Sequence, residues 1–134
     1  MRVAIKNLQK KIKINQVKIK EIARKINCPA KFDNLELRLY FVRNSVIKRL
    51  NKQFFSRDCL TDVISFNLEK DYAEIFIAPY VVKINAVKFG VGFEEELHRC
   101  AVHGILHIFG FNDESKKEKS IMWKRQENIL SKII

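Results

Sequence analysis

The sequence is poor in residues that break regular structure, and it has no long apolar segment. Four Gly and two Pro in 134 residues exclude a collagen-like, low-complexity or linker-rich chain. No apolar run approaches the ~18–20 residues that a membrane-spanning helix requires. Residues 1–13 lack the continuous apolar stretch and small-residue cleavage site of a secretory signal. We therefore expect a cytoplasmic protein that has no membrane partner.

Cysteine is also scarce. The sequence contains three cysteines, Cys28, Cys59 and Cys100. They are an odd number, are widely spaced and form no CxxC pair. Such a set makes a poor disulfide framework and fits a reducing compartment. We expect Cys28 and Cys59 to be buried or idle thiols.

The chain length predicts one domain over residues 1–134, because domains typically contain ~100–150 residues. Hydrophobic residues make up 47% of the sequence and ten residues are Phe. A chain of this size buries roughly two-thirds of its unfolded surface, so this composition is sufficient for a real core.

Positive charge is concentrated in the first part of the chain. The formal net charge is +11, and residues 1–57 hold 16 of the 26 Lys and Arg with only three acids, a balance of +13. Residues 58–134 have a balance of −2. An uneven positive field attracts polyanions, most commonly phosphate backbones. The alternative is a Lys-rich composition that only solvates a small domain, and charge alone favours neither.

The hydrophobic pattern predicts strands and helices in alternation. Leu35, Leu37, Leu39 and Phe41 repeat at every second position, which is typical of a half-buried strand. The hydrophobic pattern also predicts strands at 2–8, 63–66 and 74–77, a turn at 69–71, and helices at 15–27, 79–89, 94–109 and 120–133. A further helix follows residue 41, with Asn44 or Ser45 as its N-cap. We predict an α+β fold in which helices cover a single mixed sheet of about four strands.

The helix at 94–109 contains a candidate metal site. His103 and His107 are four residues apart, so both imidazoles lie on one helix face and can reach one ion. Gly110 can end the helix in a left-handed conformation, and Asp113 can then fold back over the two rings. Three ligands from this stretch leave a fourth position open to water, which is typical of a catalytic zinc.

This spacing resembles the zinc helix of the metzincin proteases, HExxHxxGxxH, with two changes. Asp113 replaces the third His, and carboxylates are ordinary zinc ligands. Gly104 replaces the Glu that serves as the general base in the proteases, which argues for a different substrate. A His pair at this spacing also arises by chance, but Gly110 and Asp113 at matching offsets favour a metal site. We expect His98 to be an ordinary core or surface residue.

Three segments resemble the YbeY family of bacterial endoribonuclease-like rRNA maturation factors. The family signature is similar to H-G-x-L-H-x-x-G-[YF]-D-H and stands here as HGILHIFGFND, residues 103–113. A second family element is similar to the segment that contains Leu50-Asn51, Arg57-Asp58 and TDVISF at residues 61–66. The tail from Met122 to Leu130 is similar to the closing helix of the family. The resemblance therefore spans nearly the whole chain.

The resemblance implies an α+β fold and a zinc-dependent endoribonuclease that cleaves single-stranded RNA. It further implies roles in maturing the 3′ end of 16S rRNA and in 70S ribosome quality control. The implied partners are ribosomal RNA, the 30S subunit, the 70S ribosome and ribosomal proteins. One Zn²⁺ per chain would be held by His103, His107 and Asp113, and we expect no nucleotide cofactor.

The family also suggests a catalytic residue. Many members carry an Arg where this chain has Phe55, and we expect Arg57 to take its place as the catalytic Arg. Two alternatives remain open. A non-catalytic ribosome-assembly factor fits the missing Arg, whereas a metallopeptidase fits the ligand spacing but not Gly104 or the basic first half.

Overall fold

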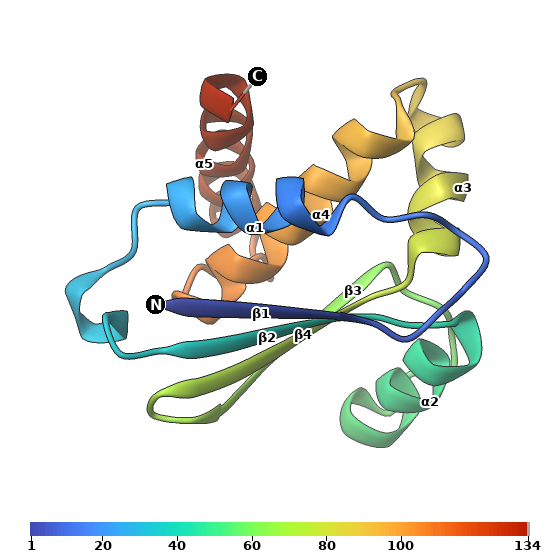
Figure 1. Cartoon of the computed structure of the whole chain (residues 1–134), viewed down its shortest axis with the longest axis horizontal. Coiled ribbons are helices and arrows are strands. Elements are labelled where there is room, and N and C mark those ends of the chain that lie inside the picture. Colours follow the sequence, from blue (N-terminus) through green and yellow to red (C-terminus); the bar gives the residue numbers. More distant parts are fainter. Residues whose placement is uncertain (134) are drawn as a thin grey trace.

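The computed structural model describes residues 1–133 and contains one four-stranded sheet with helices packed on it (Figure 1). The strands are β1 (Arg2–Asn7), β2 (Glu36–Phe41), β3 (Val63–Glu69) and β4 (Tyr72–Ile77). The helices are α1 (Gln16–Lys25), α2 (Asn44–Phe55), α3 (Pro79–Phe89), α4 (Phe93–Ile108) and α5 (Lys116–Ile133), with a short 3-10 turn η1 (Ala30–Phe32). The predicted α+β fold with a single mixed sheet is confirmed. None of the described helices is both long and apolar enough to cross a bilayer.

The sheet combines parallel and antiparallel pairing in the order β1-β2-β4-β3. Strands β1, β2 and β4 are parallel, and β3 forms an antiparallel hairpin with β4 through a turn at residues 70–71. The carboxyl ends of the three parallel strands therefore lie at one edge of the sheet, close to the first residues of α2 and α3 (Figure 1).

The main core lies between the sheet and the helices above it in Figure 1. Leu37, Leu39 and Phe41 of β2 are fully buried there, as their period of two predicts. Helices α1 and α4 pack on this face, whereas α2 lies under the opposite face near β3. A smaller apolar cluster joins α2 to the sheet through Ile47 and Ile64.

Two helix starts differ from the sequence expectation. The predicted cap at Asn44 or Ser45 is wrong, because both residues already lie in the first turn of α2, and Arg43 precedes it without a side-chain cap. Helix α5 starts at Lys116 rather than near residue 120. A capping box explains the earlier start: the Glu118 N–H donates to Ser115 Oγ (3.1 Å) and the Ser115 N–H donates to Glu118 Oε1 (3.0 Å).

Helix α4 lies close against the sheet at Gly104. The Ser65 hydroxyl donates a hydrogen bond to the Gly104 carbonyl oxygen at 2.9 Å. A Cβ atom on Gly104 would lie 3.0 Å from Ile75 Cγ2 and 3.2 Å from Val63 Cγ2. The absence of a side chain therefore lets α4 sit against β3 and β4, and it leaves no room for a Glu in the metzincin position.

We expect Gly104→Ala to lower the free energy of unfolding by about 1–2 kcal/mol, because its methyl group overpacks against Ile75 and Val63. Chemical denaturation of both proteins measures this difference. In an uncrowded helix interior the same change gains about 1 kcal/mol, so a more stable variant would contradict the packing argument.

Candidate metal centre

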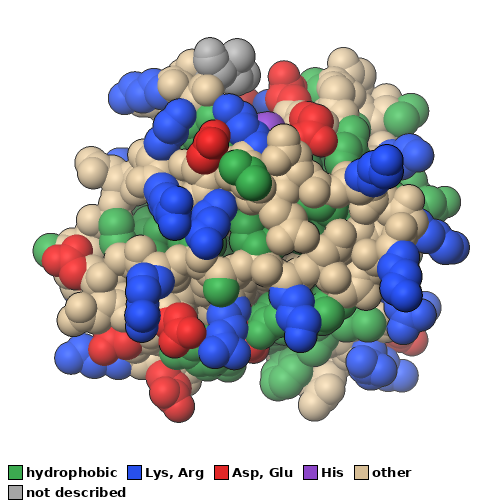
Figure 2. All heavy atoms as spheres, viewed as in Figure 1, with side chains coloured by type: hydrophobic (Ala, Val, Ile, Leu, Met, Phe, Trp, Pro, Cys, Tyr) green, Lys and Arg blue, Asp and Glu red, His purple; other side chains and the backbone are tan. Residues whose placement is uncertain are grey.

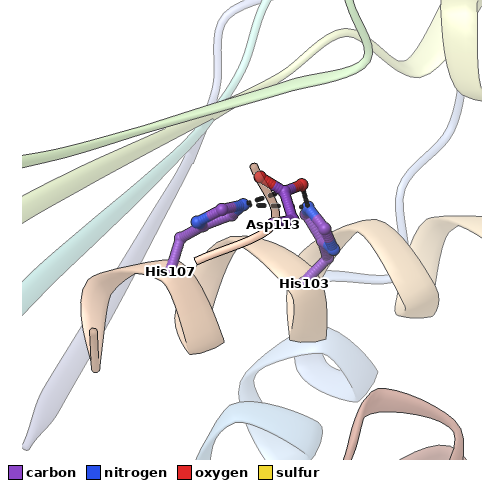
Figure 3. Close-up of side chains that lie close together, drawn as sticks. All are labelled: His103, His107 and Asp113. Atoms are coloured by element: carbon purple, nitrogen blue, oxygen red, sulfur yellow. Dashed lines mark hydrogen bonds and ion pairs between the residues drawn. The ribbon is translucent and has the colours of Figure 1, made fainter. Parts of the chain in front are cut away.

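Helix α4 and the segment after it bring three ligand side chains together. His103 Nε2 and His107 Nε2 lie 3.1 Å apart, and each lies 3.4 Å from Asp113 Oδ2. Figure 3 shows both imidazoles leaving one face of α4 while the carboxylate closes over them. The reversal depends on Gly110, whose φ of 102° suits glycine.

These distances match the geometry of a metal site. Two ligand atoms bound to a tetrahedral zinc ion at about 2.0–2.1 Å lie about 3.3 Å from each other. All three separations in the group fall close to that value. The ligand atoms therefore need little movement to accept one ion, and a fourth position stays open. Among the described residues, two groups have potential ligand atoms within 4.8 Å of one another: this group and the group of Asp62, Glu96 and Cys100.

Gln126 of α5 orients the first imidazole. His103 Nδ1 lies 2.8 Å from Gln126 Oε1, and because an amide oxygen only accepts, Nδ1 carries the proton. In the neutral ring, Nε2 then has a free lone pair directed at His107 and Asp113. Gln126 is itself buried and donates to Glu127 Oε2 at 3.2 Å. Such a partner fixes both the tautomer and the ring orientation of a metal ligand.

Burial favours the neutral form of the second imidazole. Burial lowers the pKa of His107, and the neighbouring His103 lowers it further, against the opposing effect of Asp113. A neutral ring is the form that binds a metal ion.

An ion-pair network fixes α5 against α4 beside the site. Arg99 of α4 contacts Glu96 (2.8 Å) in its own helix and Glu127 (3.0 Å) of α5. The hydrogen bond to Glu127 and, less strongly, that to Glu96 raise the pKa of Arg99, and Arg99 in turn lowers the pKa of Glu127. Because Glu127 adjoins Gln126, this network holds the helix that orients His103.

A cavity of about 540 Å³ opens beside the ligands. His103 and Asp113 line one part of it, and Lys119 and Trp123 of α5 also border it. Its lining also includes the second group, in which Cys100 Sγ donates to Asp62 Oδ2 at 3.4 Å. Burial and the adjacent Asp62 raise the pKa of Cys100, so this thiol stays protonated, and Glu96 is paired with Arg99. The protonated thiol and the paired carboxylate are therefore poor metal ligands, and we interpret the second group as part of the cavity wall.

The other candidate residues are not among those that line this cavity. His98 is half-buried, and its Nε2 lies 3.5 Å from Glu94 in the same helix without forming a hydrogen bond. Arg57 is exposed just after α2 and is not among the residues that line the cavity. The Phe55 ring stacks on Phe66 with centroids 5.9 Å apart. The three cysteines are free thiols, and Cys59 is exposed rather than buried.

The role of Gln126 cannot be predicted from the sequence, although Gln126 lies in the tail that is similar to the family. A buried amide on a later helix has no local pattern that links it to His103. The only available signal was its place in an otherwise amphipathic helix.

Fold and cluster together define an α+β protein with a His–His–Asp group on one helix, suited to a divalent metal ion. The family model for Endoribonuclease YbeY matches residues 4–134, and the chain belongs to this family.

Individual relatives agree with this assignment. Endoribonuclease YbeY of Azobacteroides pseudotrichonymphae is 38% identical over 96 residues, covering 69% of each protein. The Thermotoga petrophila protein of that name is 36% identical over 119 residues, covering 87% of this chain and 76% of its own. The solution structure of TM1509 from Thermotoga maritima is similar with a TM-score of 0.65 and 29% identity, covering 98% of this chain and 89% of that one.

Removing the Gln126 amide tests its orienting role. We expect Gln126→Ala to weaken Zn²⁺ binding by about 10–100-fold, because the His103 ring loses its Nδ1 acceptor. Competition with a chelating dye measures the affinity. Gln126→Glu retains an acceptor oxygen and should bind nearly as well as wild type, and Asn128→Ala, at an exposed position of α5, is the matched control. Equal affinity in all four proteins would remove Gln126 from the site.

Proposed function

We propose that this protein is a zinc-dependent endoribonuclease that cleaves single-stranded ribosomal RNA. The observation that carries the proposal is the His103–His107–Asp113 group, with ligand separations of 3.1–3.4 Å, in a chain of the Endoribonuclease YbeY family. The basic first part of the chain supports a polyanionic substrate. The implied context is maturation of the 16S rRNA 3′ end and 70S ribosome quality control in the cytoplasm.

The chain supplies the ligands and their orientation. The Gln126 amide oxygen leaves the proton of His103 on Nδ1, so that Nε2 can bind an ion, and burial favours the neutral ring of His107. The Asp113 carboxylate would offset part of the charge of a bound ion. A zinc ion held there would polarise a phosphate oxygen and lower the pKa of its water. Lys119, at the cavity, can attract the phosphate of the substrate. Because Gly104 has no side chain, the base must be another group of the site or the 2′-hydroxyl of the RNA itself.

Replacing a ligand tests the proposal directly. We expect His107→Ala to reduce cleavage of single-stranded rRNA fragments at least about 100-fold, because a ligand of the metal is lost. His98→Gln is the matched control, since it removes an imidazole from the same helix outside the cluster. Zinc content, measured on both proteins and on Asp113→Ala, should fall for the two ligand variants alone. Equal cleavage by wild type and His107→Ala would exclude the metal from the reaction.

Arg57 stays our candidate for the cation that stabilises charge on the phosphate. We expect Arg57→Ala to reduce kcat by about 100-fold while zinc content is unchanged. Arg49→Ala is the control, since it removes an exposed cation of α2. Matching losses in the two variants would assign Arg57 to general attraction of RNA.

A non-catalytic ribosome-assembly factor is the second candidate. It is favoured by Phe55, which occupies the position of the family Arg and stacks on Phe66. If the protein only binds, the variant with both His103 and His107 replaced by Ala restores rRNA maturation in cells that lack the protein. If the protein is a metal-dependent nuclease, this variant does not restore maturation.

A further inference from the structure

A second cavity, of about 630 Å³, lies at the carboxyl ends of the three parallel strands. Its walls are the segment after β1, the junction of β2 with α2, and the first residues of α3. Ligands commonly bind at this edge of a sheet, because loops from several strands meet there. The metal ligands are absent from its lining, so it is a separate site.

The charge of this cavity is uniformly positive. Lys10, Lys11 and Arg43 line it, and no Asp or Glu is among the described residues of its wall. These three cations form no ion pair with any carboxylate in residues 1–133. Figure 2 shows Lys and Arg spread over this face of the molecule, including the side where the segment after β1, α2 and α3 meet. Cations left without carboxylate partners around a hollow are suited to an anion.

The segment that carries the two lysines is held in place by its own hydrogen bonds. Gln9 is buried, and its amide nitrogen donates to Asn7 Oδ1 (2.9 Å) and to the Ile12 carbonyl oxygen (2.7 Å). Its amide oxygen accepts from the Ile12 N–H at 2.9 Å. Lys10 and Lys11 therefore extend from a fixed turn between Gln9 and Ile12.

The remaining wall offers features that suit a nucleotide unit. Asn44 lines the cavity, and its Oδ1 is a buried acceptor without a hydrogen-bond partner. Tyr80 is 54% exposed and presents an aromatic ring at the cavity, and exposed rings of this kind stack on unpaired bases. The first-turn N–H groups of α2, which no side chain caps, add to the positive field.

We propose that this cavity binds single-stranded RNA, with a phosphate on Lys10, Lys11 and Arg43 and a neighbouring base on Tyr80. The choice of RNA as occupant rests on the proposed function. The evidence that the cavity binds an anion comes from its own charge and shape and does not depend on that function. On this view the protein holds its substrate at two places: the metal site that cuts, and a second site that grips the strand.

Binding is measured separately from cleavage. Fluorescence anisotropy follows a 3′-labelled single-stranded RNA on the His107→Ala protein, which is expected not to cut. We expect Lys10→Ala/Lys11→Ala and Arg43→Ala to weaken binding at least about 10-fold and to flatten its salt dependence, because phosphate contacts are lost. Tyr80→Ala should weaken binding with less change in salt dependence. Lys88→Ala, at the far end of α3, is the matched control.

The outcomes separate this proposal from the nuclease. Affinities within twofold of the control for the Lys10/Lys11 and Arg43 variants would overturn the RNA site. Loss of binding in those variants supports it even if wild type never cuts RNA, in which case the nuclease proposal alone fails. Competition with adenosine monophosphate and inorganic phosphate identifies the source of the anion. Full displacement by either at micromolar concentration would overturn RNA in favour of a free small anion, whereas displacement only by unlabelled RNA supports the strand.

Discussion

The contact between α4 and the sheet at Gly104 fixes the position of the metal ligands. Backbone rather than side chain meets Ile75 and Val63 there, and the Ser65 hydroxyl bonds to the Gly104 carbonyl oxygen. Because His103 directly precedes Gly104 and His107 lies three residues later, their common direction is set by how the helix rests on β3 and β4. The glycine that distinguishes this helix from that of the metzincins therefore has a packing role.

Around that contact, each ligand is constrained from a different direction. Gln126 holds the His103 ring from α5, and Gly110 turns the chain so that Asp113 returns over both imidazoles. The Arg99 ion pairs keep α5 against α4. Most of the ligand set is local in sequence, but its orientation depends on a helix that begins only after Ser115.

The sequence was sufficient for the features that local periodicity and spacing determine. The period of two in β2 and the i, i+4 histidines needed only regular strand and helix geometry, and both elements form as expected. The start of α2 was misplaced because Asn44, a good capping residue, is instead inside the first turn. The role of Gln126 and the cavity around Arg43 could not be predicted, because each joins segments far apart in the chain and depends on how helices dock.

Trp123 lies in the wall of the cavity beside the metal ligands. This is the only tryptophan in the sequence, it is 56% exposed, and its ring lies 5.9 Å from the Arg99 guanidinium carbon. All indole emission of the protein therefore originates at the wall of this cavity. The chain carries a built-in optical reporter, whose intensity and wavelength respond when solvent around that wall is displaced.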